Sequence, residues 1–125
     1  MSLPAFVMGT LELGVAGEKI ALKFLESQGY TLKEQNWTFG RLEIDLIMQK
    51  EDTMVFVEVK MRASNYHGSP WQAVVLQKQR RIIKAADHYI KRNQWEGEAR
   101  FDIVSIVGSH TAHEVQHITS AFYPI

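Results

Sequence analysis

Hydrophobic positions recur along this chain with two different periods, which separate helical from extended segments. From about residue 11 to residue 28 the apolar residues recur at helical spacing. Gly29 follows, at the place where a residue in the left-handed conformation commonly ends a helix. The pattern therefore predicts a first helix over residues 11–28.

Five further segments alternate between apolar and polar residues or are continuously apolar, as strands are. They cover residues 30–37, 42–48, 54–61, 100–107 and 114–119. A polar turn over 49–53 joins the second and third of them, which predicts a hairpin.

The segment between the third and fourth strands predicts a second helix. After a loop over 65–69, Ser69-Pro70-Trp71-Gln72 has the spacing of a capping box with proline at the first helical position. Either the helix runs unbroken to Asn93, or a short turn precedes a main helix from about Gln77. The order is α-β-β-β-α-β-β, and a helix that crosses over between two strands implies that part of the sheet is parallel. We therefore expect an α/β domain with a mixed five-stranded sheet flanked by helices.

The predicted hairpin carries charged residues on apolar strands. Alternation places Glu58 and Lys60 on one face of the third strand, and Glu43 and Asp45 on one face of the second. The opposite face of the second strand is expected to hold Ile44, Leu46 and Met48. If the loop takes residues 50–53, antiparallel pairing sets Asp45 opposite Glu58, and Glu43 opposite Lys60.

Two carboxylates at about 5 Å repel each other unless a cation lies between them. Mg²⁺, or Mn²⁺, prefers oxygen ligands, so Asp45, Glu58 and a nearby main-chain carbonyl would be a sufficient protein contribution. Lys60 can then orient or deprotonate an attacking water, or stabilise charge on a phosphoryl oxygen. This chemistry is phosphodiester hydrolysis.

The alternative interpretation is a set of cross-strand ion pairs on a solvated face. The strongly apolar segments 44–48 and 54–59 count against it, because they predict strands buried on both faces, where unpaired acids are costly.

A third acid, Glu18, belongs to the predicted first helix. It lies in one helical stripe with small and apolar residues, namely Gly14, Ala21, Leu22 and Leu25. Its carboxylate is therefore expected to point towards the sheet and to join the site. Gly14 and Gly17 either let this helix approach the sheet closely or act as helix-end signals.

The formal net charge is zero, but the charges are unevenly distributed. Residues 60–92 hold eight Lys or Arg and one acid, whereas the segments on both sides are acidic. Such a field can steer a polyanion to one face of the molecule. The candidates for contacts with DNA phosphates are Arg62, Lys78, Arg80, Arg81 and Lys84. The alternative is an ordinary solvated helix face.

Other features of composition set limits on the class of protein. The length suits one domain over residues 1–125, with 1–10 expected to be a flexible or partly tag-derived N-terminus. The chain has no cysteine, which excludes disulfides, thiolate metal sites and a cysteine nucleophile, and which fits the cytoplasm. We find no signal-peptide pattern and no apolar run of membrane-spanning length, so no membrane is expected. The grouping of His110, His113 and His117 is attributed to chance.

A combined motif over about residues 11–122 carries a family resemblance. It consists of Gly14-x-x-Gly17-Glu18-x-x-Ala21, Gly29-Tyr30, Asn36, Glu43-Ile44-Asp45-Leu46-Ile47, Phe56-Val57-Glu58-Val59-Lys60-x-Arg62, and Ala73-Val74 with Lys78. This pattern closely resembles the YraN-like family of bacterial proteins. That family is regarded as distantly related to endonucleases of the PD-(D/E)XK superfamily, which also contains archaeal Holliday junction resolvases.

The resemblance implies roles for individual residues. Asp45 and Glu58 match the first and second metal-binding acids of the superfamily, and Lys60 matches its catalytic lysine. Glu18 matches the helix-borne acid of the resolvase-like branch, and Glu43 belongs to the family pattern without an assigned role. One position departs from the pattern, because Leu42 stands where the family has glycine. This difference bears on the local backbone path or on ligand access, and not on the acids.

The expected function is a Mg²⁺- or Mn²⁺-dependent endonuclease with a restriction-endonuclease-like fold, acting on branched or recombining DNA. A homodimer would suit symmetric cutting of two strands. Two alternatives stay open: a non-catalytic DNA-binding or DNA-processing accessory domain that retains the fold, and a protein-interaction module.

Overall fold

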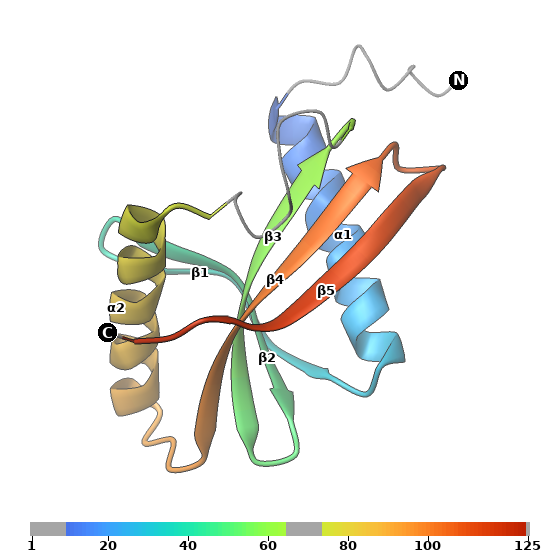
Figure 1. Ribbon diagram of the computed structural model, residues 1–125. Helices are drawn as coiled ribbons and strands as arrows, with labels where there is room; N and C mark the ends of the chain where they lie inside the picture. Colours follow the sequence, from blue (N-terminus) through green and yellow to red (C-terminus); the bar gives the residue numbers. More distant parts are fainter. Residues whose placement is uncertain (1–9, 65–73, 125) are drawn as a thin grey trace.

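Two helices and five strands follow one another in the predicted order (Figure 1). A computed structural model describes residues 10–64 and 74–124. Its elements are α1 (Thr10–Ser27), β1 (Thr31–Phe39), β2 (Leu42–Lys50), β3 (Thr53–Arg62), α2 (Leu76–Arg92), β4 (Glu98–Gly108) and β5 (His113–Phe122). The α/β class is thereby confirmed, and α2 begins close to the main-helix start expected near Gln77. The capping box over 69–72, and residues 1–9 of the expected flexible N-terminus, lie outside the described residues.

The five strands form one mixed sheet in the order β1-β2-β3-β4-β5. β3 and β4 are parallel, and the other neighbouring strands are antiparallel. The parallel pair is the one that the crossover through α2 joins, as predicted. α1 and α2 lie on opposite sides of the strongly twisted sheet (Figure 1).

Two apolar clusters fill the space between the sheet and its helices. On the α2 side, Phe56 packs edge-on against Tyr89 and stacks on Phe101. On the α1 side, Ala21 and Leu25 pack with a separate set of strand residues: Leu46, Met48, Val55, Val57, Val104 and Ile106. The middle strands are thus buried on both faces, which is the environment that their apolar sequences predict.

One glycine of α1, Gly17, lies in close contact with the sheet. A Cβ atom on Gly17 would lie 3.0 Å from the Cβ of Met61, so a larger residue there would push the helix away from β3. Gly14 has no atom within 4 Å of the equivalent position, so the prediction that it permits close approach is wrong. Gly29 ends the helix with a φ of +92°, and the Tyr30 N–H donates to the Leu25 carbonyl at 3.0 Å.

Neither helix in the described part of the chain combines the length and the apolar character that crossing a membrane requires.

Candidate active site

The β2–β3 hairpin has the predicted register. Leu46 lies opposite Val57, and Lys50 lies opposite Thr53. The ladder between the two strands stops at the Leu46–Val57 pair, and Asp45 and Glu58 are the next residues on each side. There Asp45 Oδ2 accepts a hydrogen bond of 2.8 Å from the Val59 N–H. A carboxylate thus occupies the point where the two strands part.

The alternation of side chains along β2 breaks at the same point. Ile44 belongs to the α2-side cluster together with Ile47, whereas Leu46 and Met48 belong to the α1-side cluster. The expectation that Ile44 shares a face with Leu46 and Met48 is therefore wrong. The physical reason is the interrupted ladder, which lets the strand rotate around Asp45.

Glu58 is the buried acid of the site, and a lysine from α2 reaches it. Glu58 is 3% exposed, and Lys78 Nζ lies 2.6 Å from its Oε1. Lys78 was predicted to contact phosphates; here it neutralises a carboxylate. Both residues line a cavity of about 420 Å³, which we call the acid cavity. Its other lining residues are Arg41, Leu42, Glu43, Asp45, Val75, Gln77, Arg81 and Ile82. Asp45, Glu58 and Lys78 at this cavity form the acid site.

The protonation of Asp45 is governed first by burial and then by the neighbouring carboxylate of Glu58. Burial raises the pKa of Asp45 to about 7, and the neighbouring charge of Glu58 adds to this effect. The Val59 N–H and the Lys78 ammonium act in the opposite direction without cancelling the rise. For Lys78, burial lowers the pKa, but the ion pair with Glu58 outweighs it and leaves the pKa raised. Lys78 is therefore a cation, while Asp45 is only partly ionised at neutral pH.

Two more acids, Glu18 and Glu43, lie close to Asp45, and the side-chain amide of Asn36 links them. With its nitrogen facing them, Asn36 donates to Glu18 Oε1 at 2.6 Å and to Glu43 Oε1 at 3.2 Å. Burial raises the pKa of Glu18, and the charge of Asp45 raises it further, which supports the prediction that Glu18 faces the sheet near the other acids. Sequence reasoning gave Asn36 no role, although its φ of 50° marks an unusual backbone position.

The acids nonetheless do not meet at one point. Within residues 10–64 and 74–124, no three His, Cys, Asp or Glu side chains are arranged to hold a metal ion. Asp45, Glu58 and Glu43 line the cavity beside α2, whereas Glu18 does not line it and is joined to Glu43 through Asn36. A metal ion would need a small rearrangement, because Lys78 already lies against Glu58.

Lys60 and Arg62 continue along β3 from Glu58. Both are partly exposed, and both line a cavity of about 500 Å³ together with Leu13 and Gly14 of α1. Lys60 is also close enough to Lys78 to affect its protonation. The predicted catalytic lysine therefore lies near Lys78 of the acid site, and it lines a different cavity.

The predicted phosphate-binding residues of α2 divide between two sides of the helix. Lys78 and Arg81 line the acid cavity. Arg80 and Lys84 line a different cavity of about 530 Å³, which also includes the exposed Tyr123.

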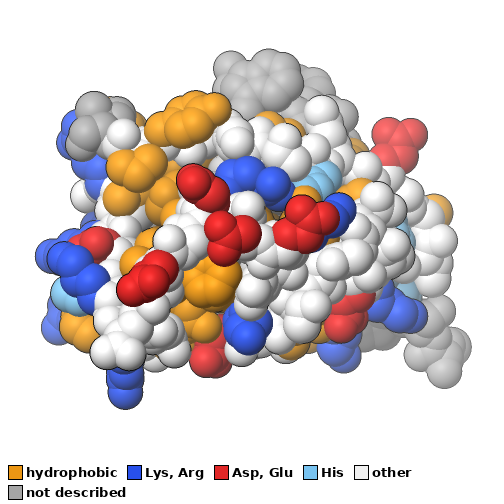
Figure 2. All heavy atoms as spheres, turned by 90° about the horizontal axis from the view of Figure 1, so that it is seen from below, with side chains coloured by type: hydrophobic (Ala, Val, Ile, Leu, Met, Phe, Trp, Pro, Cys, Tyr) orange, Lys and Arg blue, Asp and Glu red, His pale blue; other side chains and the backbone are white. Residues whose placement is uncertain are grey.

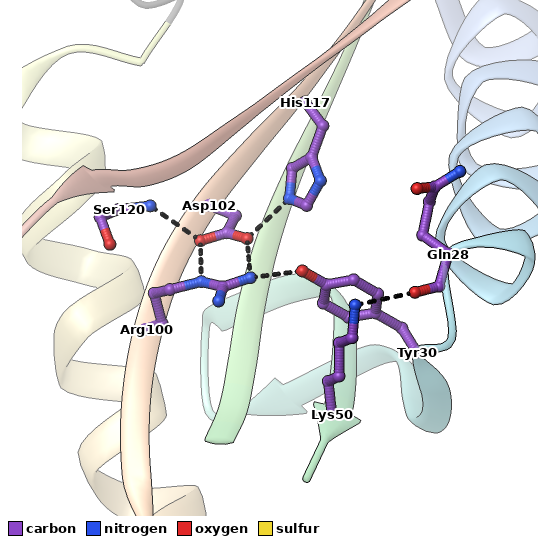
Figure 3. Close-up of polar contacts among 7 residues, drawn as sticks. All are labelled: Gln28, Tyr30, Lys50, Arg100, Asp102, His117 and Ser120. Carbon is purple, nitrogen blue, oxygen red and sulfur yellow. Dashed lines mark hydrogen bonds and ion pairs between the residues drawn. The ribbon is translucent and has the colours of Figure 1, made fainter. Parts of the chain in front are cut away.

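A second buried carboxylate, Asp102 on β4, forms a network that sequence reasoning missed (Figure 3). Its carboxylate accepts hydrogen bonds from two nitrogens of Arg100, Nε at 2.9 Å and Nη2 at 2.8 Å. It also accepts a hydrogen bond of 3.0 Å from the Ser120 N–H. The Nε2 atom of His117 lies 2.7 Å from the same carboxylate. Arg100 Nη2 also donates to the Tyr30 hydroxyl at 2.6 Å. Burial alone would raise the pKa of Asp102, but the hydrogen bonds from His117, Arg100 and Ser120 outweigh it and leave the pKa lowered.

The signal for this network was present in the sequence. Arg100 and Asp102 stand two residues apart on an otherwise apolar strand, so they share one face and can pair. His117 was grouped with two loop histidines and given no role, whereas in the structure it is the partner of Asp102 from β5.

Relatives of the chain place it in a family. The sequence pattern of the family described as "Uncharacterised protein family UPF0102" matches residues 17–106, a range that includes Glu18, Asp45, Glu58, Lys60 and Lys78. A UPF0102 protein of Bacteroides thetaiotaomicron is 42% identical over 113 residues, which cover 90% of this chain and 93% of the relative. A UPF0102 protein of Myxococcus xanthus is 41% identical over 112 residues, which cover 89% of each chain. A UPF0102 protein of Chlorobium chlorochromatii is 43% identical over 121 residues, which cover 91% of this chain and 93% of the relative.

These matches confirm the predicted bacterial family, and the more distant relationship to nucleases stays a prediction. The chain belongs to the uncharacterised protein family UPF0102.

Proposed function

We propose that this protein is a metal-dependent phosphodiesterase that cleaves DNA, with branched or recombining DNA as its substrate. One observation carries the proposal: Asp45 and Glu58 are placed together, largely buried, at the open end of a hairpin and beside a cavity. Burial and the charge of Glu58 raise the pKa of Asp45 to about 7, and a cation bound between the two carboxylates would lower it.

The donor set suits a hard divalent cation. Carboxylate oxygens of Asp45 and Glu58 would hold Mg²⁺ or Mn²⁺, and such ions keep several waters of their own. Glu18 and Glu43, linked through Asn36, add negative charge behind Asp45. When bound, the metal ion polarises a phosphoryl oxygen and lowers the pKa of a coordinated water.

The cationic side chains have separate tasks in this proposal. Lys60, two residues beyond Glu58 on β3, orients the attacking water or stabilises charge on the phosphate in the transition state. Arg41 and Arg81 line the acid cavity and bind phosphates beside the cleaved one. Contacts of this kind bind the backbone of DNA without reading its sequence.

The distribution of charge supports an approach of DNA from the end where α2 begins. Lys78, Arg80, Arg81 and Lys84 all lie in the first half of this helix. The other end of the molecule, seen from below, has acidic side chains across the middle of its surface, with basic ones among them and around the edges (Figure 2). The basic residues in the first half of α2 would therefore offer a polyanion a binding surface on a molecule whose net charge is zero.

The test is a cleavage assay with junction, flap, single-stranded and duplex DNA in Mg²⁺ or Mn²⁺, with and without a chelator. We expect cleavage that the chelator abolishes, and Glu58→Gln and Lys60→Ala should each lower the rate by about 10²–10³-fold. Glu26→Gln and Lys23→Ala on the exposed face of α1 are matched controls and should leave the rate unchanged. Cleavage of no substrate, or cleavage insensitive to both site variants, would rule the proposal out.

One observation favours a second candidate, a non-catalytic DNA-binding domain. The Lys78–Glu58 ion pair already neutralises the site without a metal ion. Calorimetric titration with Mg²⁺ separates the two candidates. A working site should bind the ion and lose it in Asp45→Asn, whereas a non-catalytic domain would bind DNA in a salt-dependent manner without needing the ion.

A further inference from the structure

The ion pair between Lys78 and Glu58 joins two side chains with very different freedom to move. The Glu58 side chain is 4% exposed and is fixed in the middle of β3, whereas the Lys78 side chain is 42% exposed and extends from α2. A buried carboxylate without a partner is costly, so Glu58 depends on this contact. Lys78 does not depend on it, because its long side chain can return to solvent.

The position of Lys78 within α2 is not explained by the helix itself. The first turn of α2 contains no acidic residue, and Lys78 is the third residue of the helix. Helix N-termini attract negative charge and disfavour a lysine. Two basic residues in the last turn, Lys91 and Arg92, follow the usual preference. The contact with Glu58 is therefore the feature that accounts for a cation at this end.

We propose that Lys78 is the resident counter-ion of the acid site and competes with a divalent cation for Glu58. This inference rests on the metal site of the proposed function and assigns its metal affinity to a residue on α2. The metal-free protein stays folded with Glu58 neutralised by the ammonium group. Binding of Mg²⁺ or Mn²⁺ requires that group to leave Oε1, and the affinity for the ion is lowered by the cost of breaking the pair.

The test is calorimetric titration of Mn²⁺ and Mg²⁺, without DNA, into the wild-type protein and into Lys78→Met. The variant should bind about 10- to 100-fold more tightly, the range that corresponds to losing one competing charge-assisted contact. Lys91→Met, at an exposed position in the last turn of α2, is the matched control and should bind as the wild type does.

Thermal unfolding gives a second measurement that does not depend on activity. Without metal, Lys78→Met should unfold at a lower temperature than the wild type, and saturating Mn²⁺ should raise its melting temperature by more than it raises that of the wild type. Lys78→Gln, which can still donate a hydrogen bond to Glu58, covers the case in which the methionine variant does not fold. It should also bind metal more tightly than the wild type.

The outcomes separate this inference from the proposed function. Metal affinity that is unchanged or weaker in both Lys78 variants overturns the competition, even if the wild type cleaves DNA with Mg²⁺. Tighter binding by the variants upholds it, even if no DNA is cleaved and the nuclease proposal fails. If neither the wild type nor any variant binds Mg²⁺ or Mn²⁺, both the competition and the proposed metal-dependent function are overturned.

Discussion

Asp45 and Asp102 are two carboxylates of one sheet with opposite surroundings. Asp102, with no exposed surface, is contacted by three residues: the Arg100 guanidinium, the His117 ring and the Ser120 N–H. Asp45 accepts a hydrogen bond from Val59 and faces further carboxylates. Hydrogen bonds lower the pKa of Asp102 despite its burial, whereas burial and Glu58 raise that of Asp45 to about 7.

Under the proposed function, this difference separates a buried acid that stabilises the fold from one that binds a metal ion. The Asp102 network joins β4 and β5 to the start of β1, and every part of it is supplied by the protein (Figure 3). The Asp45 site leaves negative charge that the protein does not fully match, and it opens to a cavity. In the proposed function, a divalent cation would match this remaining charge.

The largest expected effect is a loss of stability when Asp102 is replaced. Replacing it with alanine leaves the Arg100 guanidinium and His117 without their partner in a largely buried position. Breaking a buried ion pair in this way costs about 3–5 kcal/mol of the free energy of unfolding. Urea denaturation should show this loss, and Glu114→Ala, at an exposed position on β5, should change stability by less than about 0.5 kcal/mol. A small effect of Asp102→Ala would show that the network is dispensable and remove the contrast with Asp45.

Replacing Asp45 should have a smaller effect of opposite sign, a gain in the free energy of unfolding at neutral and higher pH. The unfolded chain ionises this group near pH 4 and the folded protein near pH 7, so the folded protein holds more protons between these values. The free energy of unfolding should therefore fall by on the order of 2–4 kcal/mol as the pH rises from about 4 to about 7, and stay low above that. Asp45→Asn should remove this fall and be the more stable protein at pH 8.

The measurement is urea denaturation across pH in buffer with a chelator, with Glu26→Gln as a control that keeps the wild-type profile. Asp102 has the reverse dependence, because its lowered pKa gives stability that is present above about pH 4 and lost as the pH falls further. If Asp45→Asn follows the wild-type curve between pH 4 and 7, the two carboxylates do not differ as described.

The smallest effect tests one hydrogen bond at the edge of the Asp102 network. Tyr30→Phe removes the hydroxyl that accepts from Arg100 Nη2 at 2.6 Å, and should cost about 1 kcal/mol because Arg100 keeps both contacts with Asp102. Tyr123→Phe, at a residue that is 67% exposed, should have no measurable effect on the denaturation curve. A loss as large as that of Asp102→Ala would mean that the network acts as a single unit.

The sequence contained enough information for the fold and for half of the site. Strand alternation and a short polar turn determine the hairpin register, because a shift by one residue would move every apolar side chain to the wrong face. The proximity of Asp45 to Glu58 follows from that register alone. Glu18 could be placed for a similar reason, since its helical stripe faces the sheet.

The remaining contacts depend on how distant elements pack. The pair of Lys78 with Glu58 requires the axial position of α2 over the sheet, which no local pattern determines. The rotation of β2 at Ile44 has its cause in a side chain that replaces a ladder hydrogen bond, and strict alternation cannot predict it. His117 was passed over because its partner, Asp102, lies on another strand and the two meet only through the β4–β5 pairing.

Strand order has a consequence for how this protein assembles. Neighbouring strands are consecutive in the chain, and the parallel β3–β4 pair alone needs a long crossover. The β2–β3 hairpin closes a short loop, so it can form within microseconds, before the slower closure that brings in α2. We therefore expect Asp45 and Glu58 to come together before α2 brings Lys78 against them.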